Sequence, residues 1–523
     1  MSADSAIQKR QTWMALLLLV ALALLLYGRT SGFEFVNYDD TEYVTDNPPV
    51  LQGLTEPGVR WAFTATHTGN WIPLTWMSHM LDVELFGTWA GGHHLVNALL
   101  HAINAVLLFL ALRALSSRAG PSLAVALLFC VHPQRVESVA WISERKDLLA
   151  GTFFFASLLL YARYARKPGW SKNLALAVLL LLGLSSKSML VSLPFVLCLL
   201  DVWPLGRWKS DASPTERAWP GRLREKWLLF VIAAAFAART FLAQDQQGAV
   251  SELTGLSIGQ RLANAGLSGW NYLLQTLWPF ELAVFYPHPV FAADNLMTEL
   301  YVPGFAALAL FLVGIYLALR WMSRVPEISV GYLWFLGMLV PVIGLVQVGE
   351  QSHADRYAYL PLVGIYIALV FGAQRCLASH PHLARWSRAV FAALIALLCL
   401  RTWDQVGHWR NTETLFAHAL EVTDKNYIAH NNYGLALLEE RRLKDAGHHF
   451  QQAVELYPKY LKGNYNLGIS LEGRQRYDEA IAAYRQCLQI DPGHALSLTR
   501  VVECQKKLEQ AQGKRRPVQG ETR

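Results

Sequence analysis

Long apolar runs constrain this chain more than any other feature. Of its 523 residues, 53% are hydrophobic and only 16% are charged, and several runs are long enough to cross a bilayer. A helix satisfies its own backbone hydrogen bonds in lipid, so each run predicts a transmembrane helix. We therefore expect an all-α, polytopic membrane protein with about 11 spans. The predicted spans are residues 12–28, 94–115, 119–134, 147–165, 172–187, 189–204, 227–243, 301–319, 329–349, 357–375 and 387–402.

Basic residues predict how these spans are oriented. The net charge is +7, and Lys and Arg gather between alternate spans, as in segment 207–226, which marks those loops as cytoplasmic. The apolar segment 261–285 is interpreted as re-entrant or interfacial, because a crossing there would put Arg320 and Arg324 outside. We expect an inner-membrane protein with a cytoplasmic N-terminus and a periplasmic C-terminal region. Nucleic acid is not expected as a partner, since no basic cluster is interleaved with stacking aromatic residues.

The C-terminal region repeats with a period of 34 residues. Small residues, aromatic residues and prolines recur at this offset, a pattern typical of tetratricopeptide repeats. The matching pairs are Asn432 with Asn466, Gly434 with Gly468, Ala446 with Ala480, Phe450 with Tyr484, and Pro458 with Pro492. We expect a transmembrane domain over 1–404 and about 2.5 repeats with a cap helix over 405–511. These repeats would form a short α-solenoid that binds proteins or peptides, followed by a disordered tail over 512–523.

An acidic pair, Asp39-Asp40, lies in the predicted first outer loop, residues 31–92. Two carboxylates beside a hydrocarbon core are costly to keep there unless they hold a cation or take part in a reaction. The pair is therefore a candidate catalytic site, and the alternative is an ordinary solvated loop.

The second span opens with His93, His94, Asn97, His101 and Asn104, and all of these except His94 recur at helical spacing and form one polar stripe. His93, His94 and Asn97 are candidates for shaping a site at the outer face, and the alternative is hydrogen bonding between helices. A metal site made by His93 and Asn97 is not expected. Asn is a poor ligand, and no carboxylate sits at ligand spacing on this helix.

Further outer loops carry charged side chains that the orientation rule does not explain. Arg145, Lys146, Lys187 and Arg356 are predicted to bind an anion such as a phosphate. His132 and Glu137 are predicted to shape the site and to orient a hydroxyl group. The alternative interpretation is an ion network that only neutralises itself.

Several of these motifs occur together, in one order, in a known family. They are Phe35-Val36-x-x-Asp39-Asp40, Pro73-Leu74-Thr75, His94-x-x-Asn97-x-x-x-His101, His132-Pro133-x-x-x-Glu137, Arg145-x-Asp147-Leu148-Leu149, Lys187, and Arg356-Tyr357-x-Tyr359-Leu360-Pro361, followed by the repeats. In them the chain resembles the transmembrane and tetratricopeptide-repeat-containing protein O-mannosyltransferases, of the GT-C class of membrane glycosyltransferases. We expect it to be a bacterial member.

The resemblance implies a GT-C helical bundle and an inverting transfer of one sugar, mannose first, from a polyprenyl-phosphate donor. The implied acceptor is a Ser or Thr hydroxyl of a protein outside the cytoplasm. The resemblance assigns the catalytic base to Asp39, with Asp40 as the alternative because the two could exchange roles, and the donor phosphate to Arg356 and Lys187. It implies no obligatory cofactor and no metal.

The chain also departs from the family pattern. Lys187-Ser188 stands where the family has Lys-Glu, and Glu144-Arg145-Lys146-Asp147 stands where it has Gly-Arg-Ala-Asp. The donor sugar and the acceptor therefore stay open. The alternative function is a non-enzymatic, membrane-anchored scaffold of an envelope complex, which would have no use for the acidic pair together with the outer cations. A transporter would show charges within span centres and symmetry between halves, and the sequence shows neither.

Overall fold

The structure is a computed structural model that describes residues 3–67, 69–208, 219–246, 256–345 and 349–515. Over these ranges the chain is helical, and its only β-type pairing is an isolated bridge between His67 and Asn70. It divides into two compact units. The first unit comprises Met1–Leu282 and Asn295–Arg410, and the second comprises Ala283–Asp294 and Asn411–Arg523.

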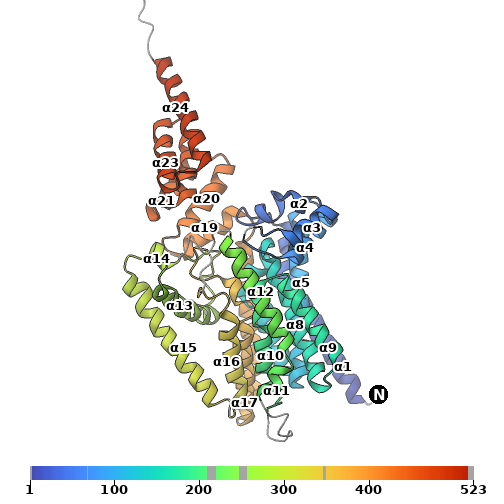
Figure 1. The fold of residues 1–523 in the computed structure, drawn as a ribbon. Coiled ribbons are helices and arrows are strands. Elements are labelled where there is room, and N and C mark those ends of the chain that lie inside the picture. Colours follow the sequence, from blue (N-terminus) through green and yellow to red (C-terminus); the bar gives the residue numbers. More distant parts are fainter. Residues whose placement is uncertain (1–2, 68, 209–218, 247–255, 346–348, 516–523) are drawn as a thin grey trace, which may run out of the picture. The chain divides into compact units, whose positions relative to one another are not determined.

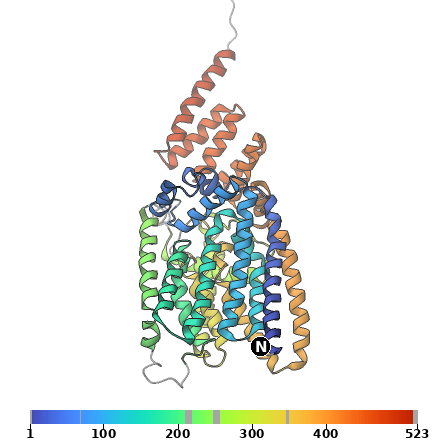
Figure 2. The ribbon, with the colours of Figure 1, turned by 90° about the vertical axis from the view of Figure 1, so that its right-hand side faces the viewer.

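The first unit is a bundle of long helices that run side by side in Figure 2. Each of the eleven predicted spans overlaps one of them. The helices are α1 (Ala3–Tyr27), α5 (Ala90–Ser116), α6 (Ala119–Val131), α8 (Arg145–Arg166), α9 (Trp170–Leu184), α10 (Leu193–Val202), α12 (Trp227–Gln246), α15 (Val302–Arg320), α16 (Pro326–Leu339), α17 (Leu362–Ala378) and α18 (Ala384–Gly407), as labelled in Figure 1 where there is room.

Five helical segments in the described residues are long and apolar enough to cross a membrane, and a bent pair of helices makes a sixth. The chain is therefore a multi-pass membrane protein. Several of the other predicted spans are apolar helices of fewer than 18 residues, such as Trp170–Leu184 and Leu362–Ala378. The number of eleven crossings stays a prediction.

The first outer loop folds into a small helical layer. It contains a helical turn at Thr41–Thr45 (η2), α2 (Pro48–Leu51), α3 (Glu56–Thr64) and α4 (Pro73–Phe86). Asn47 and Thr55 cap α2 and α3 by accepting hydrogen bonds from Val50 N at 3.4 Å and Gly58 N at 3.3 Å. Its core is made of Tyr43, Val44, Val50, Ala62, Ile72, Trp76, Met80, Ala90 and Ile142. Because Ile142 begins the turn Ile142–Glu144 that leads into α8, this core attaches the loop to the bundle.

Helix α13 (Ile258–Leu277) lies across the direction of the long helices in Figure 1. It occupies most of the segment interpreted as re-entrant or interfacial, and it is not among the helices that could span. Its backbone touches α15 where Gly266 meets Gly304, since a Cβ on Gly266 would collide with the Gly304 carbonyl oxygen. Asn264 and Ser268 both donate to the Ser352 carbonyl, at 3.0 and 2.9 Å, so α13 supports the loop before α17.

The second unit consists of stacked helix pairs. Its helices are α14 (Pro289–Ala292), α19 (Thr412–Val422), α20 (Tyr427–Glu439), α21 (Leu443–Leu456), α22 (Leu461–Gly473), α23 (Tyr477–Ile490) and α24 (Ala495–Arg515). The repeated glycines allow close packing, because a Cβ on Gly434 or Gly468 would collide with the ring of Phe450 or Tyr484.

The boundaries of the second unit differ from the sequence-based ones in three ways, the first being that residues 405–410 belong to the first unit. Segment 283–294 belongs to the second unit, and Asn426 Nδ2 donates to the Phe285 carbonyl at 3.0 Å. Helix α24 continues to Arg515, into the expected tail. Residues 516–523 of that tail lie outside the described residues.

Helices α16 and α17 pack through a pair of glycines, which gives a prediction about stability. A Cβ at Gly331 would collide with the Gly364 carbonyl oxygen, whereas a Cβ at Gly337 of the same helix meets nothing within 4 Å. Small residues let membrane helices approach closely. We expect Gly331→Val to destabilise the protein by about 1–3 kcal/mol and Gly337→Val to have little effect. Thermal unfolding of both variants in one detergent measures this, and equal melting temperatures would contradict the packing described.

Candidate functional site

A sharply bent connection between α6 and α8 carries most of the candidate residues. It consists of η3 (Pro133–Arg135), α7 (Val136–Ala140) and η4 (Ile142–Glu144), and the helices on either side of His132 differ in direction by 64°. The bend occurs because His132 is extended and Pro133 opens a new turn, with the His132 ring accepting a hydrogen bond from Gln134 N at 3.3 Å. As a result, Glu137 and Glu144 lie close to the first turn of α8.

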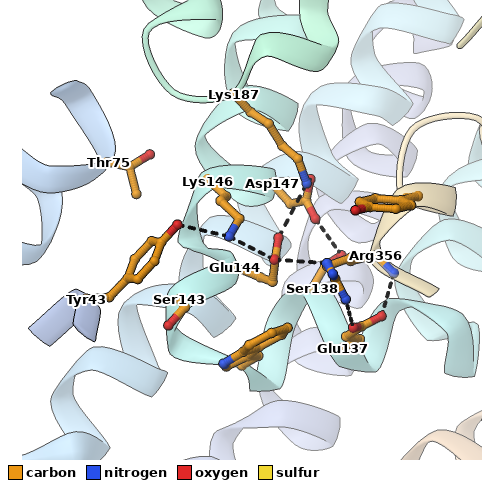
Figure 3. A network of polar contacts seen from close by, with 12 residues as sticks. Tyr43, Thr75, Glu137, Ser138, Ser143, Glu144, Lys146, Asp147, Lys187 and Arg356 are labelled. Carbon is orange, nitrogen blue, oxygen red and sulfur yellow. Dashed lines mark hydrogen bonds and ion pairs between the residues drawn. The ribbon is translucent and has the colours of Figure 1, made fainter. Parts of the chain in front are cut away.

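Arg356 is held by two buried glutamates of this connection (Figure 3). Its backbone N–H donates to Glu137 Oε2 at 2.7 Å, and its Nη1 lies 2.5 Å from Glu137 Oε1. Its Nε lies 3.2 Å from Glu144 Oε1. The guanidinium also lies over the rings of Trp141 and Tyr357, at 5.3 and 4.9 Å from their centroids.

Glu144 is shared by two further cations, as Figure 3 shows. Lys146 Nζ lies 3.0 Å from Glu144 Oε1, and Lys187 Nζ lies 3.4 Å from Oε2. Lys187 also contacts Asp147 at 2.5 Å, and Ser138 Oγ donates to the other Asp147 oxygen at 3.1 Å. We call these six ionisable residues the charge cluster: Lys146, Lys187, Arg356, Glu137, Glu144 and Asp147.

The two signs of charge in this cluster differ in accessibility. The three cations keep 12–13% of their side-chain surface exposed, whereas the three acids keep only 1–3%. The acids therefore lie behind the cations. An anion that approaches from the open side would meet Lys146, Lys187 and Arg356 first.

The first turn of α4 fixes the loop that carries Lys187. The first N–H groups of a helix have no partner within it. Here Leu74 N donates to the Ser185 carbonyl at 3.1 Å, and Thr75 Oγ1 donates to the Ser186 carbonyl at 3.1 Å. This gives the Pro73-Leu74-Thr75 motif a structural role.

The structure separates the two members of the acidic pair. Asp40 is fully buried and accepts three hydrogen bonds: from Val36 N at 3.0 Å, Ser143 N at 2.9 Å and Ser143 Oγ at 2.5 Å. Burial raises the pKa of Asp40 to about 6 against the opposing effect of these donors. Asp40 therefore ties the first outer loop to η4.

Asp39 is only partly buried, and within the described ranges its carboxylate makes no hydrogen bond or ion pair. Burial raises the pKa of Asp39, while the nearby cations Lys146 and Arg356 lower it. Of the pair, Asp39 has its oxygens free to accept a proton beside the charge cluster.

Arg145 is not part of the charge cluster, contrary to the sequence-based expectation. Its guanidinium donates to Asp82 Oδ2 at 2.7 Å, Ser78 Oγ at 2.9 Å and the His93 carbonyl at 2.8 Å, and its Nε contacts Asn97. Successive residues of a helix point about 100° apart, so Lys146 faces the cluster while Arg145 faces α4 and α5.

The remaining candidates make hydrogen bonds to groups outside the charge cluster. Asn97 Nδ2 donates to the carbonyls of Val139 and Trp141, at 3.2 and 2.9 Å, and so supports the bent connection. The ring nitrogens (Nε2) of His93, His94 and His132 face the carbonyls of Gly87, Glu34 and Thr276, at 3.1, 3.3 and 3.0 Å. These contacts join helices and loops rather than lying in the cluster itself.

Sequence reasoning missed the residues that position the Arg356 loop. The Tyr272 hydroxyl of α13 donates to the Ala354 carbonyl at 3.1 Å and accepts from Ala354 N at 3.2 Å. Sequence reasoning also missed Tyr43, whose hydroxyl accepts a hydrogen bond from Lys146 Nζ at 3.3 Å. No local pattern reveals such links, because Tyr272 and Ala354 are 82 residues apart.

Known proteins resemble both parts of the chain. Residues 405–460 and 434–495 match the family model of the tetratricopeptide repeat, which confirms the repeats. Human protein O-mannosyl-transferase TMTC1 is 27% identical over 508 residues, covering 86% of this chain and 56% of the relative. The chain is thus similar in sequence to protein O-mannosyl-transferases over most of its length. Drosophila melanogaster Tmtc1 is 32% identical over a shorter stretch of 200 residues, covering 36% of this chain and 23% of the relative.

The alignments cover only part of the length of each relative. Human protein O-mannosyl-transferase TMTC4 is 27% identical over 82% of this chain and 64% of its own length. The chain spans 56% and 59% of the length of the human and mouse TMTC1 proteins. Among solved structures, an Archaeoglobus fulgidus oligosaccharyltransferase tethered with an acceptor peptide matches with a TM-score of 0.41 and 15% identity, over 84% of this chain and 59% of that one.

The different surroundings of Asp40 and Asp39 predict different effects on stability. In Asp40→Asn, an NH₂ group replaces one of two accepting oxygens and faces a backbone or hydroxyl donor. We expect this variant to lose about 1–3 kcal/mol of stability, and Asp39→Asn to change it by less than about 0.5 kcal/mol. Melting temperatures of both variants in one detergent test this. Equal losses would contradict the structural role given to Asp40.

Proposed function

We propose that this chain is a membrane glycosyltransferase that transfers a sugar, mannose first, from a polyprenyl-phosphate donor to a Ser or Thr hydroxyl of an acceptor protein. The observation that carries the proposal is the charge cluster, whose cations are accessible beside the unpaired carboxylate of Asp39. The names of the relatives support the same reaction class.

The accessible cations suit the donor phosphate. A phosphate that leaves a sugar gains negative charge in the transition state, and fixed donors in a low-dielectric site stabilise that charge. Arg356 and Lys187 would contact the phosphate oxygens, with Lys146 next to them. Their buried acids hold the three cations in place and keep the cluster from carrying a large net charge before the donor arrives. We propose no metal for this step, because these side chains supply the positive charge.

Asp39 would act as the base. In an inverting transfer the acceptor oxygen attacks the anomeric carbon from the side opposite to the phosphate. As the new carbon–oxygen bond forms, the hydroxyl proton passes to the Asp39 carboxylate. The bond to the phosphate breaks, and the phosphate keeps the electron pair against Arg356 and Lys187.

The repeats and the orientation complete the proposal. Tetratricopeptide stacks present concave surfaces for peptides, so the second unit would recruit or present the acceptor protein. The distribution of Lys and Arg supports an inner-membrane protein with a cytoplasmic N-terminus, which puts the charge cluster and the repeats on the periplasmic face.

Loss of Asp39 should remove the transfer activity without removing the fold. In membranes supplied with polyprenyl-phosphate mannose, we expect Asp39→Asn to lower transfer to envelope proteins by about 100-fold or more, because a general base contributes that much. Glu42→Gln is the matched control, an exposed acid in the same loop that should keep near-normal activity.

Two results would contradict this assignment. Full activity of Asp39→Asn would show that another group is the base. Absence of transfer by the unmutated chain with a panel of lipid-linked sugars would favour the scaffold alternative.

The pH dependence of transfer gives a further prediction. The base must be ionised, so kcat/KM should fall as the pH falls through the pKa of Asp39, with a midpoint above the ordinary value of 3.8 because burial raises that pKa. Lys146 lowers the pKa of Asp39 and Glu42 raises it. The midpoint should therefore move up in Lys146→Met and down in Glu42→Gln. A midpoint that does not move, or moves in the opposite directions, would contradict Asp39 as the base.

A further inference from the structure

A second group of polar side chains lies beside Arg145 of α8, outside the charge cluster. His79 and Asp82 lie one turn apart on one face of α4, and His93 lies in the first turn of α5. All three are buried, and one ligand-type atom from each lies within 4.8 Å of the others. Helix α4 thus supplies the carboxylate that α5 lacks by itself.

The hydrogen bonds of His93 leave a lone pair directed at a carboxylate. Its Nε2 faces the Gly87 carbonyl at 3.1 Å, so this nitrogen carries the proton in a neutral ring. Its Nδ1 is then an acceptor, and it lies 3.4 Å from Asp82 Oδ2, which is also an acceptor. Two buried acceptors at this distance repel each other unless a cation or a proton lies between them.

His79 gives stronger evidence than His93 that an ion binds here. Its side chain is fully buried, and neither ring nitrogen has a hydrogen-bond partner among the described residues. A buried polar atom without a partner costs about 1–3 kcal/mol. Protonation of His93 would satisfy its own Nδ1 but would leave both nitrogens of His79 alone. A metal ion would satisfy His93 Nδ1, one nitrogen of His79 and Asp82 together.

We propose that His79, Asp82 and His93 bind a zinc ion. Two imidazoles and one carboxylate form a common ligand set for zinc, with water as the fourth ligand. In a tetrahedral site with bonds of about 2.0–2.1 Å, the ligand atoms lie roughly 3.3 Å apart, close to the distance between His93 Nδ1 and Asp82 Oδ2.

Two neighbouring groups would orient these ligands, as partners of metal ligands commonly do. The Gly87 carbonyl fixes the His93 ring, and Arg145 donates to Asp82 Oδ2 at 2.7 Å. A carboxylate has enough lone pairs to serve both Arg145 and an ion.

The ion would have a structural role. It would join α4 to α5 beside Arg145, the first residue of α8, and so fix the helical layer that follows Asp39 in the chain. It would not touch the charge cluster, and the inference does not depend on the proposed transfer. The expectation of no metal rested on the resemblance and on the ligands of α5 alone, and the carboxylate that α5 lacks comes from α4.

Metal content of the full chain tests the site. The protein is purified with a tag that contains no histidine, incubated with zinc chloride, passed over a desalting column and assayed by elemental mass spectrometry. We expect His79→Gln and His93→Gln each to retain about one zinc per chain less than the unmutated protein.

His449→Gln is the matched control. This variant removes one member of another pair of adjacent imidazoles, in which His430 Nδ1 and His449 Nδ1 lie 3.1 Å apart on the repeats. This variant should still retain the one zinc ion per chain that His79→Gln loses. Zinc that is lost in His449→Gln but kept in His79→Gln and His93→Gln would overturn the proposal.

A measurement without variants at the site covers the case in which those variants do not fold. X-ray absorption on zinc-loaded His449→Gln protein should show nitrogen and oxygen ligands at about 2.0–2.1 Å with imidazole scattering. Zinc should also raise the melting temperature of the same protein, and a chelator should lower it. Three results would each overturn the site: the protein retains no zinc, the absorption spectrum shows sulfur ligands, or the melting temperature changes with neither zinc nor the chelator.

Discussion

The sharing of the buried Glu144 carboxylate among three cations is the interaction on which the candidate site depends. Lys146 on α8, Lys187 between α9 and α10, and Arg356 before α17 come from distant parts of the chain, and each lies within 3.4 Å of a Glu144 oxygen. Removing one member of a buried ion pair leaves an uncompensated charge and typically costs about 3–5 kcal/mol. Glu144 therefore holds three separate segments at one place. The same arrangement leaves the cations, and not the acids, accessible to a ligand.

Two contacts hold the first outer loop on either side of this centre. Asp40 binds Ser143 on one side of Glu144, and Asp82 binds Arg145 on the other. Neighbouring residues therefore have different roles. Asp40 and Arg145 attach the loop to the bundle, whereas Asp39 and Lys146 lie on the open side, where the proposed reaction takes place. The division follows from backbone direction, because adjacent side chains on a turn or a helix cannot point the same way.

Much of this arrangement could be predicted from residue types and local periods. The apolar runs predicted the helices of the bundle, and the period of 34 predicted the repeats, because both patterns are local. The sequence also predicted that Lys146, Lys187 and Arg356 lie together, and the structure brings these three cations to Glu144. The assignment of Arg145 failed because its partner, Asp82, is 63 residues away and nothing in the sequence shows which side of α8 faces the site. The support from α13 and the membership of 283–294 in the second unit likewise rest on contacts between distant segments, which periodicity does not reveal.

The central claim is that the accessible cations hold the donor phosphate with the sugar directed at Asp39. A cryo-electron microscopy structure of Asp39→Asn with polyprenyl-phosphate mannose bound tests it most directly, since this variant should bind the donor without turning it over. We predict phosphate oxygens about 2.7–3.2 Å from Arg356 and Lys187, and the anomeric carbon facing residue 39. A donor whose phosphate lies away from these two side chains, with the charge cluster unchanged, would contradict the account.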